Sequence, residues 1–244
     1  PGQTNKAAFH IPLRLGLLNS SGEQISLKLL DEDNSQASSC FDLVLDVTED
    51  SQTFTFIDVQ EMPVPSLLRG FSAPVRLKYD YNLDELLLLM SNDSDGFNRW
   101  NASQILSTQI IESMLKPHSS GAELVLPELL KNAFAEVLDS ASDLSLDKAM
   151  LAQLLSLPVL GALIEQSSEA DVIGLHSVRE FLLNSLAIEL KDKFAEVYEL
   201  TEDQNEYSPD AESIAKRSLK NLCLNFLVRT GQQDWVNRCY QQYC

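Results

Sequence analysis

The sequence predicts a multidomain β + α protein, in which a small immunoglobulin-like antiparallel β-sandwich is followed by an all-α solenoid of the HEAT or armadillo kind. Apolar residues recur with a period of two in the first third of the chain and with a period of three to four in the remainder. A chain of 244 residues with 44% hydrophobic content is long enough for two domains. We therefore expect a sandwich domain over residues 1–81 and a helical solenoid over residues 82–244.

The first domain is expected to contain about five to seven short strands with polar turns between them. The turn at Ser20–Gln24 contains a glycine and lets the segments on either side pair as a hairpin. The polar stretch 31–39 is expected to be a loop, and the segment after it alternates apolar residues with aspartates, as a half-buried strand does. The predicted strands are Phe9–Leu18, Ile25–Leu30, Phe41–Val47, Gln52–Val59 and Ala73–Tyr81.

The segment between the last two predicted strands is expected to leave the sheet and cross to the other layer. Pro63 and Pro65 have no N–H to donate to a neighbouring strand, and each forces the residue before it into an extended conformation. In this crossing, Gly70 indicates a positive φ or a close backbone approach, and Arg69 indicates a fixed partner. We interpret Arg69 as half of a structural ion pair. The alternative is that it binds the carboxylate of a substrate.

The hand-over from strands to helices begins with Asn82–Asp93, whose leucines and methionine share one helical face and are expected to touch both domains. Residues Ser91–Gly96, SNDSDG, have the acidic spacing of a calcium loop. Taking Gly96 as the sixth position, however, puts Ser91 first and Ala102 twelfth, and neither supplies the required carboxylate. Ser94 or Asp95 is instead expected to cap the following helix.

Around this cap, Asp93 and Asp95 are the expected partners of Arg69 or Arg99. Trp100 is interpreted as a packing anchor at the interface rather than a ring on which a ligand stacks. Every later element is predicted to be a helix, and the last of them is expected to have no partner in this chain. An orthogonal helical bundle is the alternative to the solenoid, which normally ends in a polar capping face that is missing here. The predicted helices are Phe97–Lys116, Pro127–Leu138, Leu146–Leu157, Pro158–Gln166, Leu175–Leu200, one opened by Ser208–Asp210 and closed by Gly231, and Trp235–Tyr243.

Charge and cysteine content exclude several classes of partner. The 36 acidic and 18 basic side chains give a net charge of −18, which repels nucleic acid and anionic membranes. No apolar run is long enough to span a bilayer and no signal peptide is visible, so we expect a cytoplasmic protein. The four cysteines have no paired CxxC spacing and are expected to be free thiols: Cys40, Cys223, Cys239 and Cys244.

No residue of this chain is nominated as catalytic, cofactor-binding or metal-binding. A catalytic zinc site is most easily recognised in a sequence as HExxH. Here His10, His118 and His176 are isolated, and none belongs to such a motif. Ser119 and Ser120 adjoin His118, but residues that follow one another in a loop do not form a nucleophile and base held by a third group. His176 is interpreted as a surface or capping residue.

Several motifs resemble one known family. PVPSLLRGFSAPV at Pro63–Val75 and LLLLMSNDSDGFNRWNASQ at Leu86–Gln104 closely resemble the segment behind the catalytic domain of bacterial zinc aminopeptidase N, in the M1 family of metallopeptidases. FHIPLRLGLL at Phe9–Leu18 and IAKRSLKNLCLNFL at Ile214–Leu227 extend the resemblance over nearly the whole chain. In that family, this portion is a small β-domain followed by a large helical domain that closes over the active site.

The resemblance implies that the zinc ligands and the glycine-rich peptide-binding motif lie in an upstream thermolysin-like domain, so none of them can be placed on this chain. Zinc is then expected in the parent's catalytic domain and not here. The implied partners are that upstream domain of the same polypeptide and the parent's peptide substrates. Because the sequence begins without methionine and stops within an apparent helix, we expect an excised piece.

The resulting hypothesis is a non-catalytic C-terminal part of a zinc aminopeptidase, in which the sandwich positions the solenoid and the solenoid encloses the active-site chamber. The parent would remove N-terminal residues from peptides. One alternative is a free-standing interaction module that binds a peptide or a helix in its groove. A second alternative is a self-contained hydrolase, for which the sequence offers only loose Ser, His and Asp residues.

Overall fold

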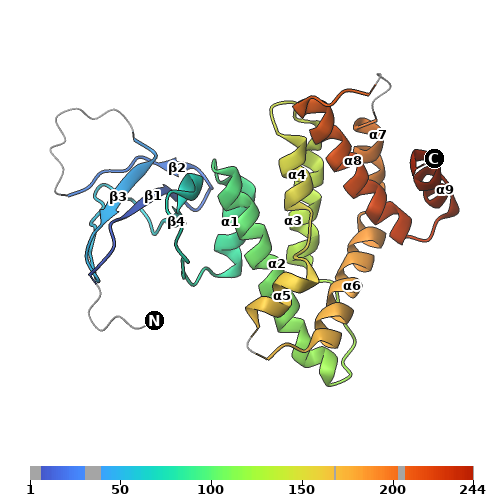
Figure 1. The fold of residues 1–244 in the computed structure, drawn as a ribbon, viewed down its shortest axis with the longest axis horizontal. Coiled ribbons are helices and arrows are strands. Elements are labelled where there is room, and N and C mark those ends of the chain that lie inside the picture. Colours follow the sequence, from blue (N-terminus) through green and yellow to red (C-terminus); the bar gives the residue numbers. More distant parts are fainter. Residues whose placement is uncertain (1–6, 31–39, 168, 203–206, 244) are drawn as a thin grey trace. The chain divides into compact units, whose positions relative to one another are not determined.

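The computed structural model describes residues 7–30, 40–167, 169–202 and 207–243; the loop expected at 31–39 and Cys244 lie outside these ranges. The chain divides into two compact units, Pro1–Ala102 and Ser103–Cys244. Figure 1 shows the strands in the first unit and a series of helices in the second. An antiparallel sheet followed by an all-helical region confirms the predicted fold class.

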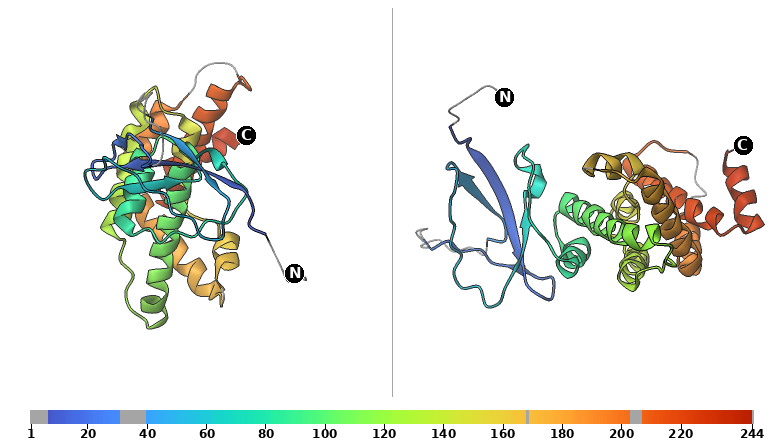
Figure 2. Two further views of the ribbon diagram at one scale, coloured as in Figure 1. Left: turned by 90° about the vertical axis from the view of Figure 1, so that its left-hand side faces the viewer. Right: turned by 90° about the horizontal axis from the view of Figure 1, so that it is seen from below.

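The sheet of the first unit is built around one long strand, β1, which pairs antiparallel with each of the others. It is the long blue ribbon in the right-hand view of Figure 2. The register places Leu13 opposite Leu45 and Leu17 opposite Ile25. The described strands are β1 (Ile11–Leu18), β2 (Gln24–Ile25), β3 (Leu43–Val47) and β4 (Val64–Leu67).

The core of this sheet consists of leucines from β1, from β3 and from the segment that follows β2. Leu15, Leu17, Leu27 and Leu45 are buried, and partly buried aromatic and aliphatic side chains pack against them. The predicted strands Ile25–Leu30 and Gln52–Val59 are shorter than expected, since the first contributes only Ile25 to β2 and the two are otherwise joined by a single bridge between Leu29 and Phe56. The alternation of apolar and polar residues thus predicted which side chains are buried more accurately than it predicted how long each strand is.

One prediction was wrong at the prolines, because Val64–Leu67 stays in the sheet as β4 instead of leaving it. The carbonyl of Pro65 accepts a hydrogen bond of 2.6 Å from the Tyr81 hydroxyl, so it faces away from β1. In an antiparallel strand, the N–H and C=O of one residue point to the same side. The N–H that proline lacks would therefore also face away from β1, and the pairing loses no hydrogen bond there.

The predicted strand Ala73–Tyr81 is also wrong, because these residues form no strand. The N–H of Val75 donates to the carbonyl of Ala73, and the N–H of Tyr81 donates to that of Tyr79. Hydrogen bonds that span only two residues turn the backbone and use donors that a neighbouring strand would need. The alternating pattern instead brings the Tyr79 and Tyr81 rings to a centroid distance of 4.3 Å.

The transition to helices occurs where the sequence indicated it. The N–H of Glu85 donates to the Asn82 side chain over 2.9 Å, and the Glu85 carboxylate accepts from the N–H of Asn82 over 2.8 Å. This reciprocal capping box satisfies two donors that would otherwise be free at the start of the helix. The described α-helices are α1 (Leu83–Asn92), α2 (Gly96–Ser119), α3 (Glu128–Asp139), α4 (Lys148–Leu154), α5 (Leu160–Gln166), α6 (Val172–Glu189), α7 (Lys191–Leu200), α8 (Ala211–Arg229) and α9 (Gln233–Tyr243), with short 3-10 turns η1 (Arg69–Phe71) and η2 (Ser140–Ser142).

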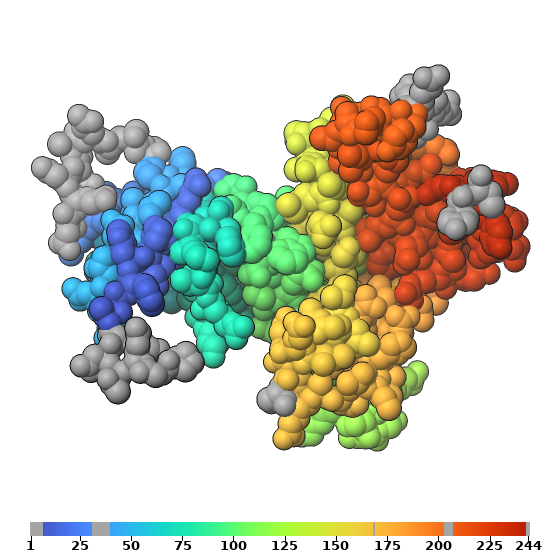
Figure 3. All heavy atoms as spheres, viewed as in Figure 1, coloured from blue at the N-terminus to red at the C-terminus, as the bar shows by residue number. Residues whose placement is uncertain are grey.

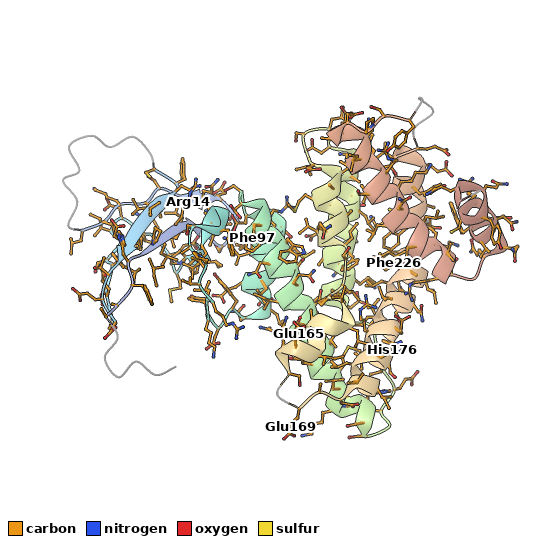
Figure 4. The ribbon with its side chains drawn as sticks, viewed as in Figure 1. Arg14, Phe97, Glu165, Glu169, His176 and Phe226 are labelled. Atoms are coloured by element: carbon orange, nitrogen blue, oxygen red, sulfur yellow. The ribbon has the colours of Figure 1, made fainter. Side chains whose placement is uncertain are left out.

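In the second unit, α8 is the element around which the others pack. It contacts α4, α6, α7 and α9, and the space-filling view in Figure 3 shows the atoms of α4 (yellow) against those of α8 (orange to red). Phe226 of α8, labelled in Figure 4, stacks on Phe194 with a centroid distance of 4.3 Å and meets Phe134 edge-on. These rings and the surrounding leucines form the core of the helical unit.

Two expectations about the helical unit were wrong. The stripe predicted as one helix over Leu175–Leu200 is divided at Leu190 into α6 and α7. A break of one residue leaves the apolar spacing nearly unchanged, so periodicity does not reveal it. The last helix also has a partner, since Trp235 of α9 meets the Tyr198 ring edge-on at 5.5 Å.

No helix in the described part of the chain is long and apolar enough to cross a membrane.

Cysteines differ in accessibility, and this gives a testable prediction. Cys223 of α8 is 0% exposed, and burial raises its thiol pKa to about 12, whereas Cys239 of α9 is exposed. Since the thiolate is the reactive form, we expect iodoacetamide at neutral pH to modify Cys239 and to leave Cys223 unmodified. Peptide mass spectrometry after a timed reaction measures this. Both should react in denaturant, and equal rates in native buffer would contradict the buried placement.

Candidate functional site

The first unit contains a buried arginine that the sequence singled out. Arg69 is 2% exposed. Its Nη2 donates to Asp93 Oδ1 over 2.9 Å, its Nε to Ser66 Oγ over 2.7 Å, and its Nη1 to Asp42 Oδ1 over 3.2 Å and Gln24 Oε1 over 3.3 Å. The structural ion pair with Asp93 is therefore confirmed. The alternative role, binding a substrate carboxylate, is unsupported because residues of the same unit already surround this guanidinium.

The guanidinium fits because β1 has a glycine beside it. A Cβ added to Gly16 would lie 2.2 Å from the Arg69 Cζ atom, well inside van der Waals contact. Sequence reasoning missed this role of Gly16. The available signal was a glycine in the interior of a strand pattern, which weakens a strand unless a neighbouring group approaches closely.

The loop that carries Arg69 has an unusual backbone. Leu68 has φ 57°, Phe71 has φ 53°, and Gly70 has φ 61°, as expected for that glycine. A left-handed conformation at a residue other than glycine costs about 1–3 kcal/mol and persists only where contacts enforce it. One such contact is the hydrogen bond from the Gly70 N–H to Asp95 Oδ2, which is 2.8 Å long.

Asp93 and Asp95 connect this loop to the start of α2. The Asp93 side chain is 0% exposed, its Oδ1 also accepts from the Asp95 N–H over 3.0 Å, and its Oδ2 accepts no hydrogen bond from any described residue. Burial raises the pKa of the Asp93 carboxyl, against the Asp95 N–H and the Arg69 charge, which lower it. Asp95 Oδ1 accepts from the Asn98 N–H over 2.9 Å, so Asp95 is the predicted cap of α2.

The other predicted positions do not form a reactive site. His10 bonds the exposed Asp46 over 2.6 Å, and His176 is exposed on α6 (Figure 4). The hydroxyls of Ser119 and Ser120 both donate to a backbone carbonyl one helical turn earlier, at 3.0 and 2.9 Å. Among the residues that the structure describes, no three His, Cys, Asp or Glu side chains come together as a metal site would require.

Trp100 is partly buried, and its ring lies 5.6 Å from the Phe97 ring. Phe97, also labelled in Figure 4, meets Phe71 of the strained loop edge-on at the same centroid distance. Phe97, which also contacts Trp100, thus packs against the loop that carries Arg69.

The second unit contains a groove of about 500 Å³ that sequence reasoning missed. It is lined by the end of α4, the α4–α5 connection, α6 and α8. Polar side chains from α6 and α8 face it, among them Arg179, Asn221, Asn225 and Arg229, and apolar residues such as Leu155 and Leu222 complete its wall. Its residues come from segments far apart in the sequence and share no motif.

The two arginines of the groove are linked through Glu180. Arg229 Nη1 donates to Glu180 Oε2 over 2.8 Å, and Arg179 Nη1 donates to Oε1 over 3.3 Å. The hydrogen bond from Arg229 is the main reason that the pKa of Glu180 is lowered, so this carboxylate is ionised at neutral pH. Burial lowers the pKa of Arg179, and the nearby Arg229 adds to the effect while Glu180 opposes it. Two positive groups thus share one negative group.

Two protein-family models together match nearly the whole chain. Residues 1–80 match the model described as a domain of unknown function (DUF3458) with an Ig-like fold, and residues 83–244 match the one described as a domain of unknown function (DUF3458_C) with ARM repeats. The chain belongs to the DUF3458 family. The Ig-like and ARM-repeat descriptions agree with the predicted sandwich-and-solenoid class.

Relatives of this DUF3458 chain include aminopeptidases. Aminopeptidase N of Escherichia coli (strain K12) is 37% identical over 228 residues, which are 93% of this chain and 25% of that protein. Aminopeptidase N of Haemophilus influenzae is 33% identical over 94% of this chain and 25% of its own length. The predicted likeness to bacterial aminopeptidase N is therefore confirmed. The chain spans about a quarter of the length of these curated relatives.

A solved structure agrees with this assignment of the DUF3458 chain. The crystal structure of Legionella pneumophila aminopeptidase A in complex with aspartic acid is similar with a TM-score of 0.73 and 30% sequence identity. The similarity covers 96% of this chain and 26% of that one. Both units of the present chain thus have counterparts within a much longer aminopeptidase.

Proposed function

We propose that these residues are a non-catalytic part of a longer M1-type zinc aminopeptidase, and that they help to position and enclose its active-site chamber. The observation that supports this most directly is a 37% identity that runs over 93% of the chain but over only a quarter of an aminopeptidase N. The proposed partners are a catalytic domain upstream in the same polypeptide and the peptides that the whole protein shortens. The proposed location is the cytoplasm.

The zinc of such an enzyme does not fit the residues present here. A catalytic zinc site takes three protein ligands held on rigid elements, usually including two histidines one helical turn apart. His10 lies just before β1, His118 in the last turn of α2 and His176 on α6, and the sequence contains no HExxH. Metal-assisted activation of water is accordingly assigned to the upstream domain and not to any residue of this chain.

The proposed domains are a sandwich over residues 1–81 and a solenoid over residues 82–244. The two family models meet near this position, at residues 80 and 83, whereas the compact units divide after Ala102. The difference has a physical cause. Asp93, Asp95 and Asn98 follow the proposed boundary but hydrogen bond to Arg69, Gly70 and Ser66 before it.

The test compares the 244-residue chain with the full-length polypeptide that contains it. We expect the full-length protein to bind zinc and to hydrolyse an aminoacyl anilide, and the 244-residue chain to do neither. Metal analysis and absorbance of the released aniline measure the two properties. Stoichiometric zinc or hydrolysis in a clean preparation of the short chain would overturn the proposal.

A free-standing peptide-binding module is the second candidate, and the groove along α8 is the observation that favours it. The native open reading frame discriminates between the two. An HExxH motif upstream in the same frame supports the peptidase, and a frame without one supports the module.

A further inference from the structure

Three polar residues of α8 form a stripe along the groove. Asn221, Asn225 and Arg229 follow one another at four-residue intervals, line the same groove, and are exposed or partly exposed. Four residues of an α-helix rise about 6 Å, and two residues of an extended peptide span about 6.6 Å. A peptide lying extended along α8 would therefore meet one of these side chains at every second residue.

The two asparagines have hydrogen-bonding groups to offer. Asn221 Oδ1 accepts from Gln242 over 2.6 Å, and Asn225 Oδ1 accepts from Arg229 Nε over 3.4 Å. Neither Nδ2 group donates to another described residue. A side-chain amide can donate two hydrogen bonds, so each asparagine can bind a carbonyl of a peptide backbone without giving up its present contact.

The charge at one end of the stripe favours an anion. Arg179 and Arg229 share the single carboxylate of Glu180, which leaves a net charge of +1, and the exposed His176 lies one turn before Glu180 on α6. Arg179 Nε donates to the Pro158 carbonyl over 2.7 Å, while Nη2 of both arginines donates to no described residue. This positive site stands out in a chain whose net charge is −18. A guanidinium with a free edge binds carboxylates through charge-assisted hydrogen bonds.

We propose that the groove binds the C-terminal end of an extended peptide, with the terminal carboxylate at Arg179 and Arg229 and the backbone along Asn225 and Asn221. Apolar wall residues that reach the surface, such as Val159, then contact the peptide side chains. A volume of about 500 Å³ is in the range of sites that enclose small ligands. The inference rests on the proposed function in one respect, because it takes the bound peptide to be a substrate. The groove would hold the C-terminus of that substrate, which is remote from the bond cleaved at its N-terminus.

The experiment uses the full-length polypeptide and two fluorescent hexapeptides that differ only at the C-terminus, one a free acid and the other an amide. Both are acetylated at the N-terminus, so that neither presents the amine that an aminopeptidase requires. Fluorescence anisotropy should show the acid binding about tenfold more tightly than the amide, as expected for one charge-assisted contact. Equal affinities of the wild-type protein for the acid and the amide would refute the proposal, and so would a failure to bind either peptide.

Point variants test which residues cause the preference for the free acid over the amide. Arg179→Gln and Arg229→Gln should each remove most of the preference for the acid, whereas Arg179→Lys should keep part of it. Asn225→Leu should weaken the acid and the amide equally, because both peptides have the same backbone. Arg76→Gln, which changes an exposed arginine of the first unit, is the matched control and should alter neither affinity. A preference that survives both glutamine variants would place the carboxylate elsewhere and overturn the assignment.

Anilide hydrolysis by the same preparation separates this inference from the proposed function. Hydrolysis without a preference for the acid would contradict the groove assignment alone. A preference for the acid without hydrolysis would contradict the aminopeptidase assignment alone.

Discussion

Replacing Arg69 with methionine is expected to lower the free energy of unfolding of the first unit by about 3–5 kcal/mol, the usual cost of removing one partner of a buried ion pair. Asp93 would remain at 0% exposure without its counter-charge. Urea unfolding of the 244-residue chain, followed by Trp100 fluorescence in a Trp235→Phe background, measures the change. Arg76→Met makes the same substitution at an exposed site and should cost less than about 0.5 kcal/mol.

A second variant separates the ion pair from simple loss of packing. In the double variant Arg69→Met/Asp93→Leu no buried charge is left unpaired, and such replacements by apolar residues are often neutral or stabilising. We therefore expect the double variant to recover at least half of the stability that Arg69→Met loses. If the single variant costs under about 1 kcal/mol, or if the double variant is the less stable of the two, the ion pair does not hold this unit together.

Replacing Gly16 with alanine is expected to lower the free energy of unfolding by about 3 kcal/mol. The added methyl group would occupy space now filled by the Arg69 guanidinium, 2.2 Å from its Cζ atom, so either the strand or the arginine must move. Overpacking alone costs about 1–3 kcal/mol, and displacing the arginine would also weaken its bond to Asp93. The same urea titration measures the loss.

Two comparisons make this second expectation specific. Gly161 lies in α5 with no neighbouring atom within 4 Å of an added Cβ, so Gly161→Ala should be neutral or stabilising by up to about 1 kcal/mol. In an Arg69→Ala background the space beside Gly16 is vacant, and Gly16→Ala should then cost much less. A Gly16→Ala penalty that is unchanged in that background would mean that the arginine is not its cause.

The parts of the fold that were predicted from the sequence depend on local chemistry. Asp95 caps α2 and Gly231 has φ 73° at the end of α8, because caps and left-handed turns use few residue types. Features set by distant neighbours were missed. Whether Pro65 can pair depends on the side that its missing N–H would face, and the residues Ala73–Tyr81 depend on a tyrosine contact with β4. Neither is visible in a run of alternating residues.

The candidate sites likewise contain some features that the sequence predicted and others that depend on residues far apart in the chain. The sequence predicted that Asp93 and Asp95 would pair with Arg69 or Arg99, and the structure pairs Asp93 with Arg69. Asp42 and Gln24 reach the same guanidinium from 27 and 45 residues away, and only the folded sheet brings them there. The stripe on α8 has a regular spacing, but its significance depends on Arg179 of another helix. Spacing alone does not separate it from a solvated face.

The bonds of Arg69 also limit how this gene can be cut or recombined. An expression boundary placed after Tyr81, where the strand-forming region ends, would separate Arg69 from Asp93 and Gly70 from Asp95. The resulting β-only product would keep Arg69 with its partly exposed partner Asp42 but without its buried counter-ion Asp93. A transplantable module must therefore extend at least through Asn98, whose amide reaches back to Ser66.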